Sequence, residues 1–532
     1  MTDLAPEIAA AVMDCAAVRG ATARLDGLAV TASYRGREAR FTLPASGTDL
    51  DAMATIPAAL PTRARGDIRE KTLYNFLQDM AGPPGDRVSD ARLRDGLADL
   101  MPTDQGQRSV LASVAERQYW IHPRATSSSR PFLAPFHCDL PATYDYHGRY
   151  KSFRGSFLLF LCWDGTGFDL ALPREIIEFL GSDDGLNPLD RAFLAAARAA
   201  VPGQAPISSD AGRLEERFGK ELREVLANGA FDQHGLDRVR RDLRTILDLK
   251  LPRHDKAQAL IAGFSLNVAL YYYRLAYRLG EGLACASQVL DDEQLPERPD
   301  FDGRVLFRVG SAGDRPISAS DPCARSWWRL DEQHLLALPA SMASSALLHE
   351  AALASGAPCG PQPDPYQCAQ ALAADPDSRV LADFFCAASA AVLVATQGAS
   401  LDLSEPGAGG YVLREAVLRS FRDRGSALKQ RGRDVVNSFV GSFGGELKRS
   451  RGRVRFFELD EQVIFLLVKL ILESSHRQQM AYRKEFLPSL REYGLAPQSL
   501  AEEELLAQAL GRLGLLERYS DAGEAMYVRH IL

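Results

Sequence analysis

The chain has 532 residues, which is too many for one ordinary domain, so we expect about two to four domains. Hydrophobic residues make up 46% and charged residues 25% of the sequence, a balance typical of globular proteins with packed cores. The net charge of −7 excludes a surface that is cationic throughout, so any role in nucleic-acid binding must lie in a local patch.

Cysteine usage and the apolar stretches bear on where the protein works. The eight cysteines include no C-x2-C pair, which favours buried free thiols in a reducing compartment over a disulfide framework or a zinc site. The N-terminus has no basic stretch before its apolar residues, so it does not resemble a signal peptide. The longest apolar run begins at Val380 and contains Asp383, which favours a buried helix over a membrane span. We therefore expect a cytoplasmic protein with no membrane contact.

Residues 1–190 are expected to form a mixed α/β domain. Alternating apolar residues flank Arg35-Gly36, and a second set flanks Asp164-Gly165. Both patterns predict β-hairpins, because glycine accepts the positive φ of a tight turn. A helix over 174–181 should follow the second hairpin and stop at Gly181.

Residues 191–410 are expected to form a mainly helical middle domain. Helical periodicity covers 212–229, and a stretch over 255–282 is apolar nearly all round, which predicts a long central helix. The Pro- and Gly-rich stretch at 402–410 is the predicted last domain boundary.

The segment 411–455 carries a positive net charge, opposite to that of the whole chain. It holds twelve lysine or arginine residues against four acidic ones, in a protein that is negative overall. Its densest part, residues 448–455, has no large apolar side chain before Val454, and we expect an exposed loop or strand edge there.

The last segment, 456–532, shows three helical patterns followed by two short apolar strands around Gly523. Three helices and a hairpin are the order of a winged-helix domain, a variant of the helix-turn-helix. The third helix begins with Glu502, Glu503 and Glu504, which would repel DNA phosphates. The basic segment and the hairpin arginines are therefore the better candidates for DNA contact, and protein docking by this domain stays equally open.

The sequence "FFELDEQVIFLLVKLI", the helices after it and above all the final "SDAGEAMYVRHIL" resemble the C-terminus of the phosphorothioation-dependent restriction proteins DptG/DndG. The resemblance covers the last ~75 residues. It implies a bacterial anti-phage defence complex in which this chain is a subunit without ATPase activity, acting beside ATPase and translocase partners. It supplies no catalytic residues.

Motifs for catalysis are weak. The chain has no G-x-x-x-x-G-K-[ST] loop and no G-x-S-x-G elbow, so we expect neither ATP binding by a Walker loop nor a serine hydrolase. Asp434, Glu446 and Lys448 fall in the permissive D…E-x-K order of metal-dependent nucleases, but the surrounding sequence is not typical of a buried catalytic strand. A nuclease is our third hypothesis, and we predict no enzyme activity and no cofactor.

One loop region holds two further candidate features. His122, His137 and His147, with Cys138, Asp139 and Asp145 nearby, contain suitable zinc donors, but their spacing matches no common site, and we predict no bound metal. Basic residues interleave with aromatic ones in the same region, as in single-strand binding surfaces. This possible secondary nucleic-acid loop consists of Arg130, Arg149, Lys151 and Arg154.

We therefore predict an α+β, mostly helical, multidomain protein that acts as a DNA-contacting or scaffolding subunit of a restriction complex. It would hold DNA through phosphate contacts that do not read sequence. The alternative is an interaction adaptor without DNA affinity. The predicted DNA-binding residues are Lys448, Arg449, Arg451, Arg453, Arg455, Arg518 and Arg529.

Overall fold

The computed structural model describes most of the chain and shows a mainly helical protein with four small sheets in the described part. The longer described ranges are 4–45, 90–99, 104–121, 136–140, 169–200, 233–292, 334–397, 402–422, 445–449, 455–459, 461–495, 500–519 and 526–530, and shorter pieces lie between them.

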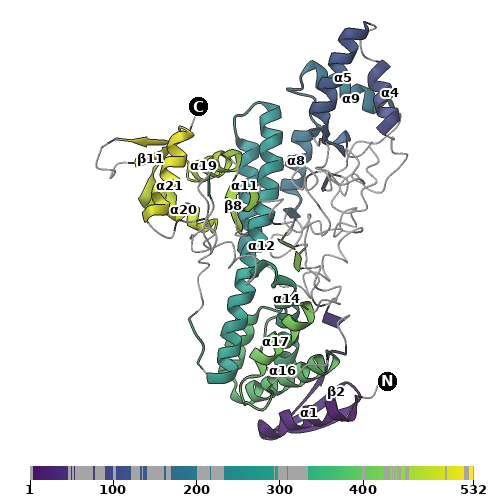
Figure 1. Cartoon of the computed structure of the whole chain (residues 1–532), viewed down its shortest axis with the longest axis vertical. Coiled ribbons are helices and arrows are strands. Elements are labelled where there is room, and N and C mark those ends of the chain that lie inside the picture. The colour runs from purple at the N-terminus through teal and green to yellow at the C-terminus, as the bar shows by residue number, and fades with distance from the viewer. Residues whose placement is uncertain are drawn as a thin grey trace.

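Helix α12, Arg253–Asp292, is the central element of the molecule. It runs for 40 residues and extends the predicted helix at both ends. Figure 1 shows it passing from the upper part of the molecule to the lower end, with other elements grouped along it. Leu260 and Leu279 are buried in one hydrophobic core, whereas Leu283 and Leu290 are buried in another. The nearly all-round apolar pattern arises because one helix serves two cores.

The first core joins α12 to segments from both sides of it in sequence. Its described helices are α8, Ala171–Gly181, α11, Gln233–Asp248, α19, Glu461–Ser474, α20, Leu487–Glu492, and α21, Leu500–Arg512. Helix α8 ends at Gly181, as predicted. The predicted helix over 212–229 lies outside the described residues, except Glu216.

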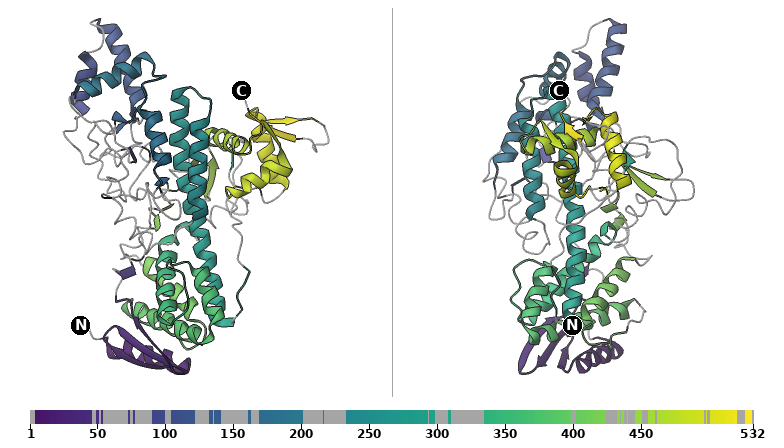
Figure 2. Two further views of the ribbon diagram at one scale, coloured as in Figure 1. Left: turned by 180° about the vertical axis from the view of Figure 1, so that it is seen from behind. Right: turned by 90° about the vertical axis from the view of Figure 1, so that its left-hand side faces the viewer.

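The second core occupies the opposite end of α12, where the N-terminus also lies (Figures 1 and 2). Its helices are α1, Pro6–Val18, α14, Leu338–Ala354, α15, Pro365–Ala374, α16, Pro376–Thr396, and α17, Gly409–Arg422. Because α17 packs on α16 across the 402–408 loop, the start of the predicted basic segment belongs to this core.

A three-stranded antiparallel sheet covers one side of the second core, in the order β1, Thr22–Asp26, β2, Ala29–Tyr34, and β3, Arg37–Thr42. The predicted hairpin around Arg35-Gly36 is confirmed. Both residues have positive φ, +47° and +84°, which matches the twist of a tight hairpin. Strand β1 was not predicted.

Helix α16 confirms the prediction of a buried apolar helix. It is the one helix in the described part of the chain that is long and apolar enough to cross a membrane, but 78% of its apolar window is buried inside the protein. Asp375 caps its N-terminus by accepting a hydrogen bond from the Ser378 amide, and Pro376 occupies the first turn. Asp383 within it pairs with Arg19, and both side chains are almost fully buried.

A third, smaller core lies at the other end of the molecule from the second. It contains α4, Asp90–Asp99, α5, Gln105–Tyr119, and α9, Pro188–Ala200, beside the short strands β4, Trp120–Ile121, and β5, Phe132–Leu133. The predicted second hairpin is wrong where it is described. Leu161 and Cys162 are helical, and α8 already begins at Ala171, because this apolar stretch feeds a helical core rather than a sheet.

Two more sheets are built mainly from the C-terminal third of the chain. The first has the order β6, Arg308–Val309, β8, Arg455–Leu459, and β7, Gly445–Arg449. The second has the order β10, Leu516–Arg518, β11, Met526–Arg529, and β9, Gln479–Ala481. We call residues 461–530 the C-terminal unit. It stands beside the upper half of α12 in both figures.

Candidate functional site

The densest part of the predicted basic segment, residues 448–455, lies in a β-hairpin. Strands β7 and β8 pair antiparallel, and the last pair of the ladder is Arg449 opposite Arg455, with Lys448 opposite Phe456. Residues 450–454, which include the predicted Arg451 and Arg453, join the strands and lie outside the described residues. We call residues 445–459 the basic hairpin.

The nuclease hypothesis depends on the same hairpin. Glu446 and Lys448 lie two residues apart on β7, so the E-x-K pair is on a strand. Glu446 stands opposite Glu458 in the ladder. Asp434 lies outside the described residues, so the structure does not assemble the three-residue set.

The C-terminal unit contains the predicted three helices and hairpin, and adds one strand. Helix α19 is followed by β9, a π-helical turn over Tyr482–Phe486, α20, α21 and the β10–β11 hairpin. Gly494 and Gly514 end the second and third helices with φ of +73° and +72°. Strand β11 lies between β10 and β9, so the hairpin is tied back to the residues after the first helix. Gly523 and its turn lie outside the described residues.

Of the two arginines predicted to bind DNA from the β10–β11 hairpin, one is already paired with a carboxylate. Arg529 forms an ion pair with Glu517 of the neighbouring strand, which neutralises it. The Tyr519 hydroxyl also donates to Glu517, at 2.6 Å. Arg518 is exposed at the end of β10. Of the two predicted arginines, Arg518 is therefore the stronger candidate for a phosphate contact.

The third helix, α21, presents an acidic and apolar surface. Glu503 pairs with Arg483 at 3.2 Å and is partly buried. Glu504 and Leu505 are exposed, and Leu500 at the start of the helix is 67% exposed. The carboxylates on this surface would repel phosphates, so it is not typical of a DNA-reading helix.

A buried polar network fastens the C-terminal unit to α11. The Tyr493 hydroxyl, just after α20, lies 3.1 Å from both carboxylate oxygens of Asp242. The Arg238 guanidinium lies over the Tyr493 ring at 4.5 Å and reaches Glu492 at 3.2 Å. Burial raises the pKa of Asp242 to about 6, although Arg238 and Arg241 oppose the shift. The network joins residues 251 positions apart, which no local sequence pattern indicates.

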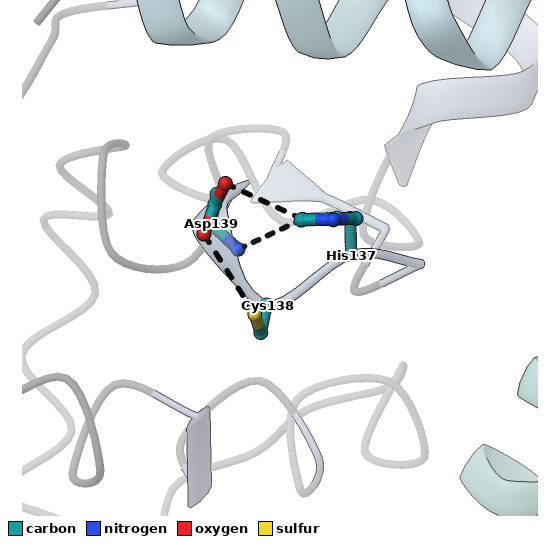
Figure 3. A group of neighbouring side chains, drawn as sticks. All are labelled: His137, Cys138 and Asp139. Atoms are coloured by element: carbon teal, nitrogen blue, oxygen red, sulfur yellow. Dashed lines mark hydrogen bonds and ion pairs between the residues drawn. The ribbon is translucent and has the colours of Figure 1, made fainter. Parts of the chain in front are cut away.

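Three consecutive side chains lie close together next to Arg198 of α9. Figure 3 shows His137, Cys138 and Asp139, whose donor atoms all lie within 4.8 Å of one another. His137 and Cys138 are buried, and Asp139 is partly buried. Burial lowers the pKa of His137, so its imidazole is neutral at pH 7, and burial raises the pKa of the Cys138 thiol to about 12. The other predicted donors, His122, His147 and Asp145, lie outside the described residues.

Two residues that the sequence did not single out complete this cluster. Asp183, after α8, lies 3.3 Å from His137 Nε2. Arg198 of α9 bridges the two carboxylates, at 2.9 Å from Asp139 and 3.1 Å from Asp183. Neither residue stands out in the sequence, and the ion pairs of Arg198 with Asp139 and Asp183 join them to the histidine segment.

The possible secondary nucleic-acid loop, Arg130, Arg149, Lys151 and Arg154, lies outside the described residues. No protein-family model matches the sequence, and no curated protein matches it either.

Proposed function

We propose that the protein is a non-catalytic subunit that holds DNA by its phosphate backbone and couples it to a larger assembly. The observation that carries the proposal is the basic hairpin. Its ladder ends on Arg449 opposite Arg455, next to Lys448, and the residues that join the strands add Arg451 and Arg453. Arginine binds phosphate through paired N–H donors and needs no base-specific contact.

The C-terminal unit supports the proposal in a second way. Its order of helix, strand, two helices and hairpin matches the order expected for a winged-helix domain. Such domains often bind DNA. Exposed Arg518 would add one phosphate contact from the wing. The Tyr493–Asp242 contact attaches this unit to α11, which packs on α12. DNA bound by the C-terminal unit would therefore be attached to the rest of the subunit.

The resemblance of the last ~75 residues to DptG/DndG proteins supplies the setting. In that setting the chain works in the cytoplasm, within a phosphorothioation-linked anti-phage restriction complex, and ATPase or translocase subunits supply the energy. The helical cores around α12 would provide the scaffold to which those subunits attach.

DNA binding is tested by fluorescence anisotropy of the full chain on a short unmodified duplex across a salt series. Arg449, Arg451, Arg453 and Arg455 are changed together, to alanine in one variant and to lysine in its matched control. Removal of each phosphate contact should flatten the slope of log affinity against log salt by about 0.9, and the lysine variant should keep most of the slope. Equal slopes for wild type and the alanine variant would refute the role of the hairpin.

An interaction adaptor is the second candidate, and the exposed face of α21 favours it. Leu500 and Leu505 are 67% and 55% exposed, and Glu504 lies beside them. If wild-type protein shows no salt-dependent DNA binding, this face becomes the leading contact surface. Leu505→Arg should then abolish co-purification with the partner subunit, and Gln508→Arg on the same helix serves as its control.

A further inference from the structure

We infer that residues 137–139 form a binding site for a divalent cation of intermediate softness, Zn²⁺ by preference. His137, Cys138 and Asp139 offer one nitrogen, one sulfur and one oxygen donor within 4.8 Å of one another. This mixed set suits zinc better than Mg²⁺ or Ca²⁺, which favour oxygen alone.

The Asp139 carboxylate lies near both other donors, at separations close to those around a shared tetrahedral ion. Its Oδ2 lies 3.7 Å from His137 Nδ1, and its other oxygen, Oδ1, lies 3.7 Å from Cys138 Sγ. Donors that share a tetrahedral zinc, with bonds of about 2.0–2.3 Å, lie about 3.4–3.6 Å apart. Binding would replace the hydrogen bond of 3.1 Å that the Asp139 amide donates to Nδ1. Small side-chain adjustments would thus complete the site.

The residues around the triad match the outer shell of a metal site. A histidine that binds metal through one ring nitrogen usually donates its other N–H to a carboxylate. His137 Nε2 is buried and makes no hydrogen bond of good geometry, yet Asp183 Oδ1 lies only 3.3 Å away. Arg198 holds both Asp183 and Asp139. A metal on Nδ1 would place the proton on Nε2, facing Asp183.

Hydrogen bonds with residues of α8 and α12 fix the backbone around the triad. The Cys138 amide donates to the Leu180 carbonyl at 3.2 Å, and Arg253 of α12 donates to the carbonyls of Leu180 and Phe136. A Cβ on Gly181 would lie 3.1 Å from Cys138 Sγ, so this glycine leaves room for the sulfur. The donors are thus presented by a segment fixed to α8 and α12.

The charges around the site permit a dication. Asp139 and Asp183 balance the positive charges of Arg198 and Arg253 around His137. Metal binding would displace the Cys138 thiol proton, and the resulting thiolate would add a negative charge next to the ion.

Co²⁺ tests the site because its thiolate complexes absorb in the near ultraviolet. Full-length protein, reduced and freed of metal by chelation, should bind one equivalent of Co²⁺ with a thiolate charge-transfer band, and Zn²⁺ should bleach that band. Cys138→Ser should abolish the band, whereas Cys386→Ser, at a buried thiol of α16, should leave it unchanged. No band from wild type, or a band that survives Cys138→Ser, would overturn the proposal.

A second variant avoids the core and therefore any loss of folding. The Asp183 side chain is 58% exposed, so Asp183→Asn should fold normally. It should keep the band but weaken Co²⁺ binding by about tenfold to a hundredfold, as expected for an outer-shell carboxylate. Asp184→Asn, one residue along, is the matched control and should bind as wild type. Equal affinity in both variants would contradict the proposed geometry.

Discussion

Replacing Asp242 by asparagine should flatten the pH dependence of the contact between the C-terminal unit and α11. Burial raises the pKa of Asp242 to about 6, compared with about 3.9 for an unperturbed aspartate. The folded protein therefore holds this proton more tightly than the unfolded chain. The resulting stabilisation is complete below about pH 4 and is lost as the pH rises through 6.

The size of the effect follows from that shift. Two pKa units correspond to about 3 kcal/mol, and about 1.4 kcal/mol of this lies between pH 8 and pH 5. When the pH is lowered from 8 to 5, the wild-type protein should therefore gain about 1.4 kcal/mol of stability that the Asp242→Asn variant does not gain. The other groups of the network, Arg238, Arg241, Glu492 and Tyr493, are common to both proteins and cancel in the comparison.

Hydrogen exchange measured by mass spectrometry on peptides from α11 and α20 reports local opening free energies without requiring two-state unfolding of a large protein. Asp237→Asn is the matched control, because Asp237 lies on the same helix with its side chain 54% exposed. Its pH profile should follow wild type. If wild type and Asp242→Asn give parallel profiles between pH 5 and 8, the assignment of a buried, proton-linked Asp242 is refuted.

Four further substitutions test three sites in the second core and one glycine of α21. Arg19→Ala should lower the free energy of unfolding by about 3–5 kcal/mol, because it leaves Asp383 buried without its cation; a loss below 1 kcal/mol by chemical denaturation would contradict this. Gly409→Ala should also destabilise the protein, since its Cβ would collide with the Asp383 carbonyl oxygen. Gly511→Ala, on α21, should instead raise the thermal midpoint, because its Cβ would meet no atom within 4 Å and the helix would gain about 1 kcal/mol. Asp364→Ala removes the cap of α15 and the partner of Arg278, and should cost about 1–2 kcal/mol and speed amide exchange in that helix.

Local chemistry explains which parts of the fold were predictable. The Arg35-Gly36 hairpin, the buried helix α16 and the helices ended by Gly181, Gly494 and Gly514 each depend on residues within one turn of the feature. The apolar stretch around Leu161 was misassigned because a short apolar run fits a buried strand or a buried helix equally well. Its partner in the core decides between them.

The candidate sites were predictable in part for the same reason. The basic residues 448–455 stand out by composition, but the pairing of Arg449 with Arg455 needed the register of β7 on β8. Asp183 reaches His137 from 46 residues away, and Arg198 reaches Asp139 from 59 residues away. The ion pair of Arg529 with Glu517 depends on hairpin register. Such contacts leave no periodic signal in a single sequence.

The continuity of α12 has a mechanical consequence. A helix of 40 residues is about 60 Å long and resists bending over that distance. Since its two halves are embedded in different cores, a rotation of about 5° at one end moves the other by about 5 Å. A displacement of the second core would thus be passed along α12 to the C-terminal unit, which contacts the other half of this helix through α19.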